Sequence, residues 1–316
     1  MIIEGFENSK ELLDKRKLFL VCGNSFDRLE FADYIKGLEP IRFGNFRPNP
    51  LYEEVLDGVE VFNNSGCDTI LAVGGGSAID VAKSIKFYSK SNAEIIAVPT
   101  TSGTGSESTH FAVIYKDGVK QSVADQSLLP EYVILEASTL LNVPLYTRKA
   151  TMLDALCHSI ESYWAKKATA ESRGIANRAI RGILEHKDSY LRNEEIGNAG
   201  MLKAANLAGQ AINMTTTTAG HAMCYKITSL YGFAHGHAAA LCLPEVWKVN
   251  KTEIPGITLE AFINLFDDLE LEYPISKNRE AEISVLVDSV NPQRLGNNPV
   301  ELDEDTIRQM YERIIR

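Results

Sequence analysis

TILAVGGGSAIDVAKSIK, residues 69–86, is the stretch that decides the fold expected of this chain. Its apolar start predicts a buried strand, three glycines follow, and apolar residues then recur at helical spacing. Glycine permits backbone angles closed to other residues and lets main-chain N–H groups approach a ligand. Because a helix N-terminus reached through glycines favours a phosphate group, this unit predicts either a phosphate site or a purely structural tight turn.

The rest of the first half repeats this alternation of strand and helix. Short apolar runs such as KLFLVCG and EIIAVPT alternate with helical patterns such as LYEEVLDGVEVFNNS. The alternation is typical of an α/β domain with a parallel, doubly wound, Rossmann-like sheet. A second loop, PTTSGTGSE at 99–107, follows the next strand, and two such loops at adjacent strand ends would hold a dinucleotide. The glycines do not form the GxGxxG pattern, so the usual Rossmann inference does not transfer directly.

The second half of the chain reads as helical. Stretches such as ATMLDALCHSIESYWAKKA and SRGIANRAIRGILEH have apolar residues at period 3.6, with little strand signal. Pro144 lies where the pattern changes, because proline ends an element. We therefore expect a dinucleotide-binding α/β domain at 1–146 and an all-α, metal-binding and catalytic domain at 147–316, with a ligand cleft where they meet.

Composition narrows the function classes. Thirty-two basic residues against 42 acidic ones give a net charge of −10, and no long Lys/Arg run occurs, so we expect no nucleic-acid partner. Five scattered cysteines without a CxxC pair fit reduced thiols in a cytoplasmic protein. No signal-peptide pattern and no apolar run of roughly 18 residues occurs, so we expect no membrane partner.

A candidate metal site combines residues from two distant stretches. Asp154 and His158 stand four apart on a helical stretch and so share one face, although such a pair alone is more often a surface contact. The surrounding apolar residues indicate burial, and a buried carboxylate needs compensation that a divalent cation supplies. His221 and His235 would complete an Asp/His₃ set, which suits Fe²⁺ or Zn²⁺. His237 is an alternative ligand or a hydrogen-bonding neighbour.

Four motifs together resemble the iron-containing (group III) alcohol dehydrogenases: GGGSAID, VPTTSGTGSE, DALCHSIESY and GHAMCYKITSLYGFAHGHAAALCLP. The resemblance runs from about Leu18 to Pro244. It implies the dehydroquinate synthase-like fold of that family, with a divalent metal in the cleft between the two domains. It also implies an enzyme that uses NAD(P)H to reduce a small aldehyde to a primary alcohol. Relatives are often dimers or larger, so a homodimer is an open option.

The resemblance implies roles for individual residues. The metal ligands would be Asp154, His158, His221 and His235. The cofactor would be bound by Gly75, Gly76, Ser77, Asp80, Thr100, Thr101, Thr104 and Lys120. Tyr225 replaces a second histidine that many members carry near the reacting carbonyl, so Tyr225, with His237 nearby, is the catalytic candidate for proton transfer. Gly44 replaces an Asp of NAD-preferring members, and the loss of that carboxylate favours NADP(H) or the use of both NADP(H) and NAD(H).

The run Thr215–Thr218 suggests the substrate. Family members usually have small apolar residues there, whereas Thr216, Thr217 and Lys226 would offer hydroxyls and a cation to an anionic oxygen cluster. This block and the ending NPQRLGNNPVELDEDTIRQMYERII are similar to the phosphonoacetaldehyde reductase (hydroxyethylphosphonate dehydrogenase) branch. The threonines could instead begin a helix, with Lys226 solvated. The other open functions are a general short-chain alcohol or diol dehydrogenase, a lyase of dehydroquinate-synthase type, and a nucleotide- or metal-binding module without turnover.

Overall fold

The apolar runs of the first half pair as one parallel sheet in the computed structural model, which describes residues 1–316. The six strands lie in the order β1-β8-β5-β4-β2-β3, and every neighbouring pair is parallel. Their bounds are β1 Ile2–Glu4, β2 Leu18–Cys22, β3 Ile41–Phe43, β4 Thr69–Gly74, β5 Glu94–Pro99 and β8 Tyr132–Leu135. The predicted Rossmann-like sheet is confirmed.

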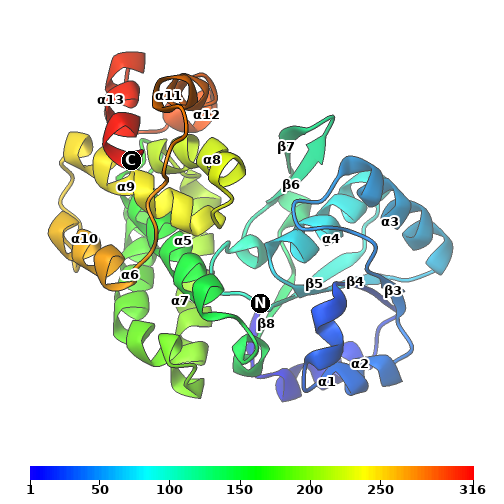
Figure 1. Cartoon of the computed structure of the whole chain (residues 1–316). Coiled ribbons are helices and arrows are strands. Elements are labelled where there is room, and N and C mark those ends of the chain that lie inside the picture. The colour runs from blue at the N-terminus through cyan, green and yellow to red at the C-terminus, as the bar shows by residue number, and fades with distance from the viewer.

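Helices cover both faces of this sheet (Figure 1). In the view shown, α3 and α4 lie above the sheet and α1 and α2 lie below it. The central strands β2, β4 and β5 are buried on both sides because their residues alternate between two apolar clusters, one containing Leu71 and the other Ile70. The helices are α1 Lys10–Leu13, α2 Ala32–Gly37, α3 Tyr52–Ser65 and α4 Gly76–Ser89.

The two predicted loops leave neighbouring strands at the same edge of the sheet. Gly74 at the end of β4 is opposite Pro99 at the end of β5. The glycine turn then enters α4, while the second loop contains a short 3₁₀ helix, η3, at Ser106–Ser108. An antiparallel hairpin of β6 (Phe111–Lys116) and β7 (Val119–Ala124) follows and packs against α4. Further 3₁₀ turns are η1 Phe6–Ser9, η2 Asn24–Arg28, η4 Gln126–Leu128 and η5 Ala137–Leu140.

The second half is entirely helical, as predicted, and lies beside the sheet domain (Figure 1). Pro144 precedes α5, so the boundary proposed at residue 146 falls in the first turn of that helix. The helices are α5 Leu145–Trp164, α6 Ala170–Leu191, α7 Glu195–Thr215, α8 Ala219–Tyr231, α9 His235–Asn250, α10 Leu259–Asp268, α11 Arg279–Asp288, α12 Pro292–Leu295 and α13 Glu304–Ile314. They surround one large apolar core, and none is long and apolar enough to span a bilayer.

The second loop is also fixed to the helical domain. A Cβ atom on Gly105 would lie 2.4 Å from the Cα of Gly209 in α7, so loop and helix touch backbone to backbone. The amide of Asn206, also in α7, donates a 2.5 Å hydrogen bond to the Oγ of Ser108. The loop therefore contacts both domains and fixes the position of this edge of the sheet relative to α7.

Gly209→Ala is expected to destabilise the protein by about 1–3 kcal/mol, because the new methyl group would lie 2.6 Å from the carbonyl oxygen of Gly105. Thermal unfolding followed by circular dichroism measures the loss. Gly174→Ala is the matched control, since Gly174 lies in α6 with no atom within 4 Å of the added Cβ. This control should stabilise the helix by about 0.5–1 kcal/mol, and equal effects of the two substitutions would contradict the packing argument.

Candidate active site

Three helices bring a carboxylate and three imidazoles together. Asp154 and His158 lie one turn apart on α5, His221 lies in the first turn of α8, and His235 begins α9. The ligand atoms of Asp154, His158 and His221 all lie within 4.8 Å of one another. The His235 ring centre is 5.3 Å from that of His221 and faces the same cleft. The structure therefore brings together all four residues expected as ligands, three of them closely.

Glu161 orients His221 from the side of its ring that faces away from Asp154. It lies on α5, fully buried, and its Oε2 pairs with the Nδ1 of His221. Its Oε1 accepts hydrogen bonds from the Oγ1 of Thr218 at 2.7 Å and from the backbone N–H of His221 at 3.2 Å. The Nε2 of His221 then points at the Oδ1 of Asp154, 3.4 Å away. Sequence reasoning missed Glu161, although its spacing of seven residues from Asp154 places it on the same helix face.

The charges and orphaned atoms of this cluster suit a divalent cation. Burial lowers the pKa of His158 to about 4, so its imidazole is neutral and keeps a lone pair. The Nδ1 of His158 is buried and has no hydrogen-bond partner. Burial opposes the charge on Asp154, but the surrounding histidines outweigh it and hold the pKa of this carboxyl below its usual value. Burial opposes the charge on His221, but Glu161 and Asp154 outweigh it and raise the pKa of this imidazole to about 9, so a cation would compete with a proton there. A buried carboxylate facing imidazoles is a donor set for Fe²⁺ or Zn²⁺.

The two glycine-containing loops face this cluster from the sheet domain. A Cβ on Gly75 would lie 3.1 Å from the Oγ1 of Thr101, and one on Gly76 would lie 2.9 Å from the Oγ1 of Thr104. The loops are thus in contact, and glycine is needed where they cross. Gly76, Ser77, Asp80 and Thr104 line the cleft, whereas Gly75, Thr100 and Thr101 do not.

Asp80 and Lys83 of α4 tie the second loop and the hairpin to the sheet domain. The Oδ1 of Asp80 accepts from the Oγ of Ser106 at 2.5 Å, and its Oδ2 accepts from the N–H of Val113 at 3.1 Å. Lys83 is fully buried, and its Nζ donates to the carbonyl oxygens of Ser106, Thr109 and Phe111 at 2.5, 2.7 and 3.0 Å. Burial lowers the pKa of Lys83 to about 8. Sequence reasoning missed Lys83; its only signal is a lysine on an apolar helix face.

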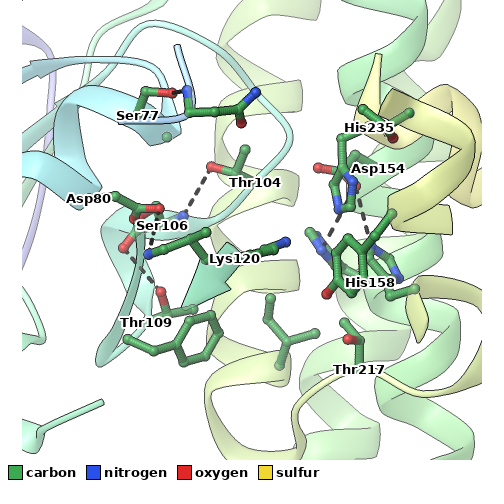
Figure 2. Close-up of a pocket in the computed structure, with 18 of the residues that line it drawn as sticks. Ser77, Asp80, Thr104, Ser106, Thr109, Lys120, Asp154, His158, Thr217 and His235 are labelled. Carbon is green, nitrogen blue, oxygen red and sulfur yellow. Dashed lines mark hydrogen bonds and ion pairs between the residues drawn. The ribbon is translucent and has the colours of Figure 1, made fainter. Parts of the chain in front are cut away.

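One cleft joins the two halves (Figure 2). Figure 2 shows Ser77, Asp80 and Thr104 on one side and Asp154, His158 and His235 on the other, with Lys120 of β7 reaching between them. The cavity has a volume of about 240 Å³. A dinucleotide on the loops would therefore reach the imidazole cluster.

Tyr225 forms part of the cleft wall next to the imidazoles. Its ring lies parallel to that of His235 at 5.5 Å, and the Nζ of Lys120 is 3.6 Å from the Tyr225 ring centre. Burial raises the pKa of Tyr225, so the side chain stays a phenol at neutral pH. The neighbouring Cys224 has its Sγ 3.6 Å from the Nδ1 of His235, and burial raises the pKa of this thiol.

His237 does not reach the cleft. It is buried on another face of α9, where its Nε2 is 2.9 Å from the carbonyl oxygen of Glu272 and its Nδ1 is 3.2 Å from the hydroxyl of Tyr146. Its ring stacks on Phe233 at 4.4 Å and lines a different cavity. The reason is the helical period: a residue two positions after His235 points about 200° away from it. His237 therefore lies outside the cleft that contains Tyr225, and the catalytic role expected of it has no support in this geometry.

Only one of the three residues predicted to bind an anion lines the cleft. A second cavity shares Lys120 and Tyr225 with the cleft, and Thr216 lines that cavity alone. Lys226 lines neither of the two. Thr217 does line the cleft, where its Oγ1 accepts a hydrogen bond from the Nη1 of Arg294. The cations of the cleft are Arg294, from α12, and Lys120. Sequence reasoning missed Arg294 because no local pattern links it to Thr217, 77 residues earlier.

Gly44 follows β3 on the exposed edge of the sheet and does not line the cleft around the imidazoles. A Cβ there would lie 2.7 Å from the backbone oxygen of Cys22 at the end of β2. Close approach of the two strand ends is thus one physical reason for glycine at this position.

Comparison with known proteins identifies relatives along the whole chain. The family model for the iron-containing alcohol dehydrogenases matches residues 4–137, and that for the C-terminal part of the Fe-containing alcohol dehydrogenase family matches residues 149–307. An NADPH-dependent butanol dehydrogenase of Clostridium saccharobutylicum is 28% identical over 97% of this chain and 93% of its own length. A 1,3-propanediol dehydrogenase of Citrobacter freundii is 34% identical over 68% of this chain and 60% of its own length.

Solved structures show the same fold. The structure of a sulfoacetaldehyde reductase from Bifidobacterium kashiwanohense in complex with NAD⁺ matches with a TM-score of 0.90 at 25% identity, covering 99% of this chain and 96% of that one. An iron-containing alcohol dehydrogenase from Thermotoga maritima matches with a TM-score of 0.86 at 26% identity, covering 99% and 97%.

Glu161→Gln is expected to weaken binding of Fe²⁺ or Zn²⁺ about 10- to 100-fold, because a neutral amide orients His221 less firmly and raises its basicity less. Competition with a chelator measures the affinity. Glu245→Gln makes the same chemical change at a buried residue that pairs with Lys248 and Arg313, and it should leave the affinity unchanged. Wild-type affinity in Glu161→Gln would contradict the orienting role.

Proposed function

This chain belongs to the iron-containing alcohol dehydrogenase family, and we propose that within that NAD(P)-linked oxidoreductase family it reduces phosphonoacetaldehyde to 2-hydroxyethylphosphonate. The observation that carries the proposal is the single cleft in which the glycine loops, the imidazole cluster and two cations meet. The loops would bind the cofactor, the cluster would hold the metal, and the cations would attract a charged substrate.

The proposed ligands are Asp154, His158, His221 and His235, whose buried, partly unpartnered donors fit a divalent ion. When bound, the ion would supply Lewis acidity toward the aldehyde oxygen, while the nicotinamide cofactor would supply the hydride. The glycine turn at Gly76 offers backbone N–H groups at the start of α4 for the cofactor phosphates.

Tyr225 is the proton donor that we propose for the reduced carbonyl. Its ring lies parallel to His235, and burial raises its pKa, so it reaches the reaction as a phenol. Lys120, 3.6 Å from the ring centre, would stabilise negative charge that develops on the phenol oxygen after the proton leaves.

An anionic aldehyde is favoured by the charge of the cleft. The protein as a whole is acidic, with a formal net charge of −10, yet Lys120 and Arg294 both point into this cleft. The structural similarity to a sulfoacetaldehyde reductase supports this class of substrate, because sulfoacetaldehyde is a two-carbon aldehyde with a negatively charged tail. A plain short-chain alcohol or diol dehydrogenase is the second candidate, because the relatives include dehydrogenases of butanol and 1,3-propanediol.

The test of the proposed function is an aldehyde panel on protein of measured metal content. We expect kcat/KM for phosphonoacetaldehyde to exceed that for butanal about 100-fold, since a charge-assisted pair of hydrogen bonds contributes roughly 3 kcal/mol. Nicotinamide absorbance follows the rate. A preference for butanal would favour the second candidate, and no net change in absorbance with any aldehyde would reject the oxidoreductase.

We expect the wild-type protein to use NADPH at least as well as NADH, because Gly44 places no carboxylate against a 2′-phosphate. Gly44→Asp should lower the NADPH to NADH ratio of kcat/KM about 10-fold or more through like-charge repulsion. Gly44→Ala adds the same Cβ beside Cys22 without the charge, so it separates packing from selectivity. An equal shift in both variants would count against the charge argument.

A further inference from the structure

We propose that Arg294 on α12, with Thr217 and Lys120, forms a receptor for a tetrahedral oxyanion, either a phosphonate or a sulfonate, on the tail of the substrate. The inference rests on the proposed aldehyde reduction for the other end of that substrate. It assigns tail recognition to Arg294, which lies in the ending NPQRLGNNPVELDEDTIRQMYERII but was not among the predicted site residues.

The first argument is that two positively charged side chains in the cleft have no counterion. Neither Arg294 nor Lys120 has a carboxylate within ion-pair distance, although both line the same cleft. Both lie against the ring of Tyr225, with the Arg294 Cζ 5.7 Å and the Lys120 Nζ 3.6 Å from its centre. Burial, together with the charge of Arg294, lowers the pKa of Lys120 to about 8. Two half-buried cations that repel each other are stabilised by an anion between them.

The second argument is that Arg294 is held in place before any ligand binds. The side chain of Asn291 accepts a 3.0 Å hydrogen bond from the backbone N–H of Arg294. The Nδ2 of Asn297 donates to the carbonyl oxygens of Thr215 and Thr217 at 2.8 and 3.1 Å. These bonds join the segment around α12 to the threonine run.

The backbone of the threonine run is strained where it meets this segment. Thr216 has φ 60°, a region that β-branched residues rarely occupy. Such strain persists only where the surroundings over-determine it, and it concentrates at binding sites. Here it turns the chain between α7 and α8 so that the Thr217 hydroxyl meets the Nη1 of Arg294.

The third argument is position relative to the reacting end. Tyr225 packs its ring against His235 and against both cations, so one aromatic side chain separates the proposed metal ligand from the proposed tail receptor. A substrate with an aldehyde at one end and an anionic group at the other would therefore bind along this ring. The guanidinium, the ammonium and the Thr217 hydroxyl together offer enough donors for the three oxygens of a phosphonate or sulfonate.

The experiment compares Arg294→Gln with wild type on phosphonoacetaldehyde, sulfoacetaldehyde and butanal. We expect kcat/KM for whichever anionic aldehyde the enzyme uses to fall about 10- to 100-fold, mostly through KM, while butanal stays within about twofold. Arg294→Lys should recover only part of the loss, because an ammonium lacks the planar fork. Arg308→Gln, which removes an arginine outside the cleft, is the matched control and should leave kcat/KM unchanged for all three aldehydes. The relative rates of the two anionic aldehydes identify the tail.

Binding of methylphosphonate, measured by calorimetry on wild type and Arg294→Gln, tests the receptor without turnover. Loss of binding in Arg294→Gln supports the receptor even if wild type reduces no aldehyde, which would overturn only the proposed function. Equal binding to both proteins overturns the receptor. An equal loss of rate on butanal and on the anionic aldehydes, or a rise confined to the KM of the cofactor, also overturns it.

Discussion

The burial of Asp154 among imidazoles is the constraint on which the helical domain depends. A carboxylate removed from water requires positive charge nearby, and α5, α8 and α9 converge so that their histidines face it. Glu161 adds a second buried carboxylate to the same helix and uses it to hold His221. Two buried carboxylates and three imidazoles form a donor set that a divalent cation would complete. The side chains that form the site are therefore also part of the packed interior of the domain.

The cleft depends equally on one loop that is fixed from both sides. Lys83 and Asp80 hold the loop after β5 from the sheet domain, while α7 holds it from the helical domain through Gly209 and Asn206. Because both anchors are buried, the loop cannot shift without breaking contacts in one domain. The geometry between a cofactor on the loops and the imidazoles is consequently set by the interior of the protein.

Sequence patterns predicted whatever depends on neighbours along the chain. The alternation of strands and glycine turns determines the parallel sheet, and the spacing of Asp154 and His158 determines their common helix face. Sequence patterns did not predict the features that depend on contacts between distant segments. Arg294 meets Thr217 across 77 residues, and Lys226 was chosen only because it is near in sequence. His237 lies off the cleft because its helical phase differs from that of its neighbour. The metal and cofactor roles of the remaining residues stay predictions.

The state of the cysteines has a consequence for an enzyme that handles aldehydes. Four of the five thiols are buried, and burial raises the pKa of each, to about 11 for Cys22. The thiolate, rather than the thiol, attacks electrophiles. Cys224, although it lies beside His235, is therefore a poor nucleophile toward a carbonyl carbon in the cleft. The four buried thiols are therefore held in the form that is least able to add to an aldehyde bound in the cleft.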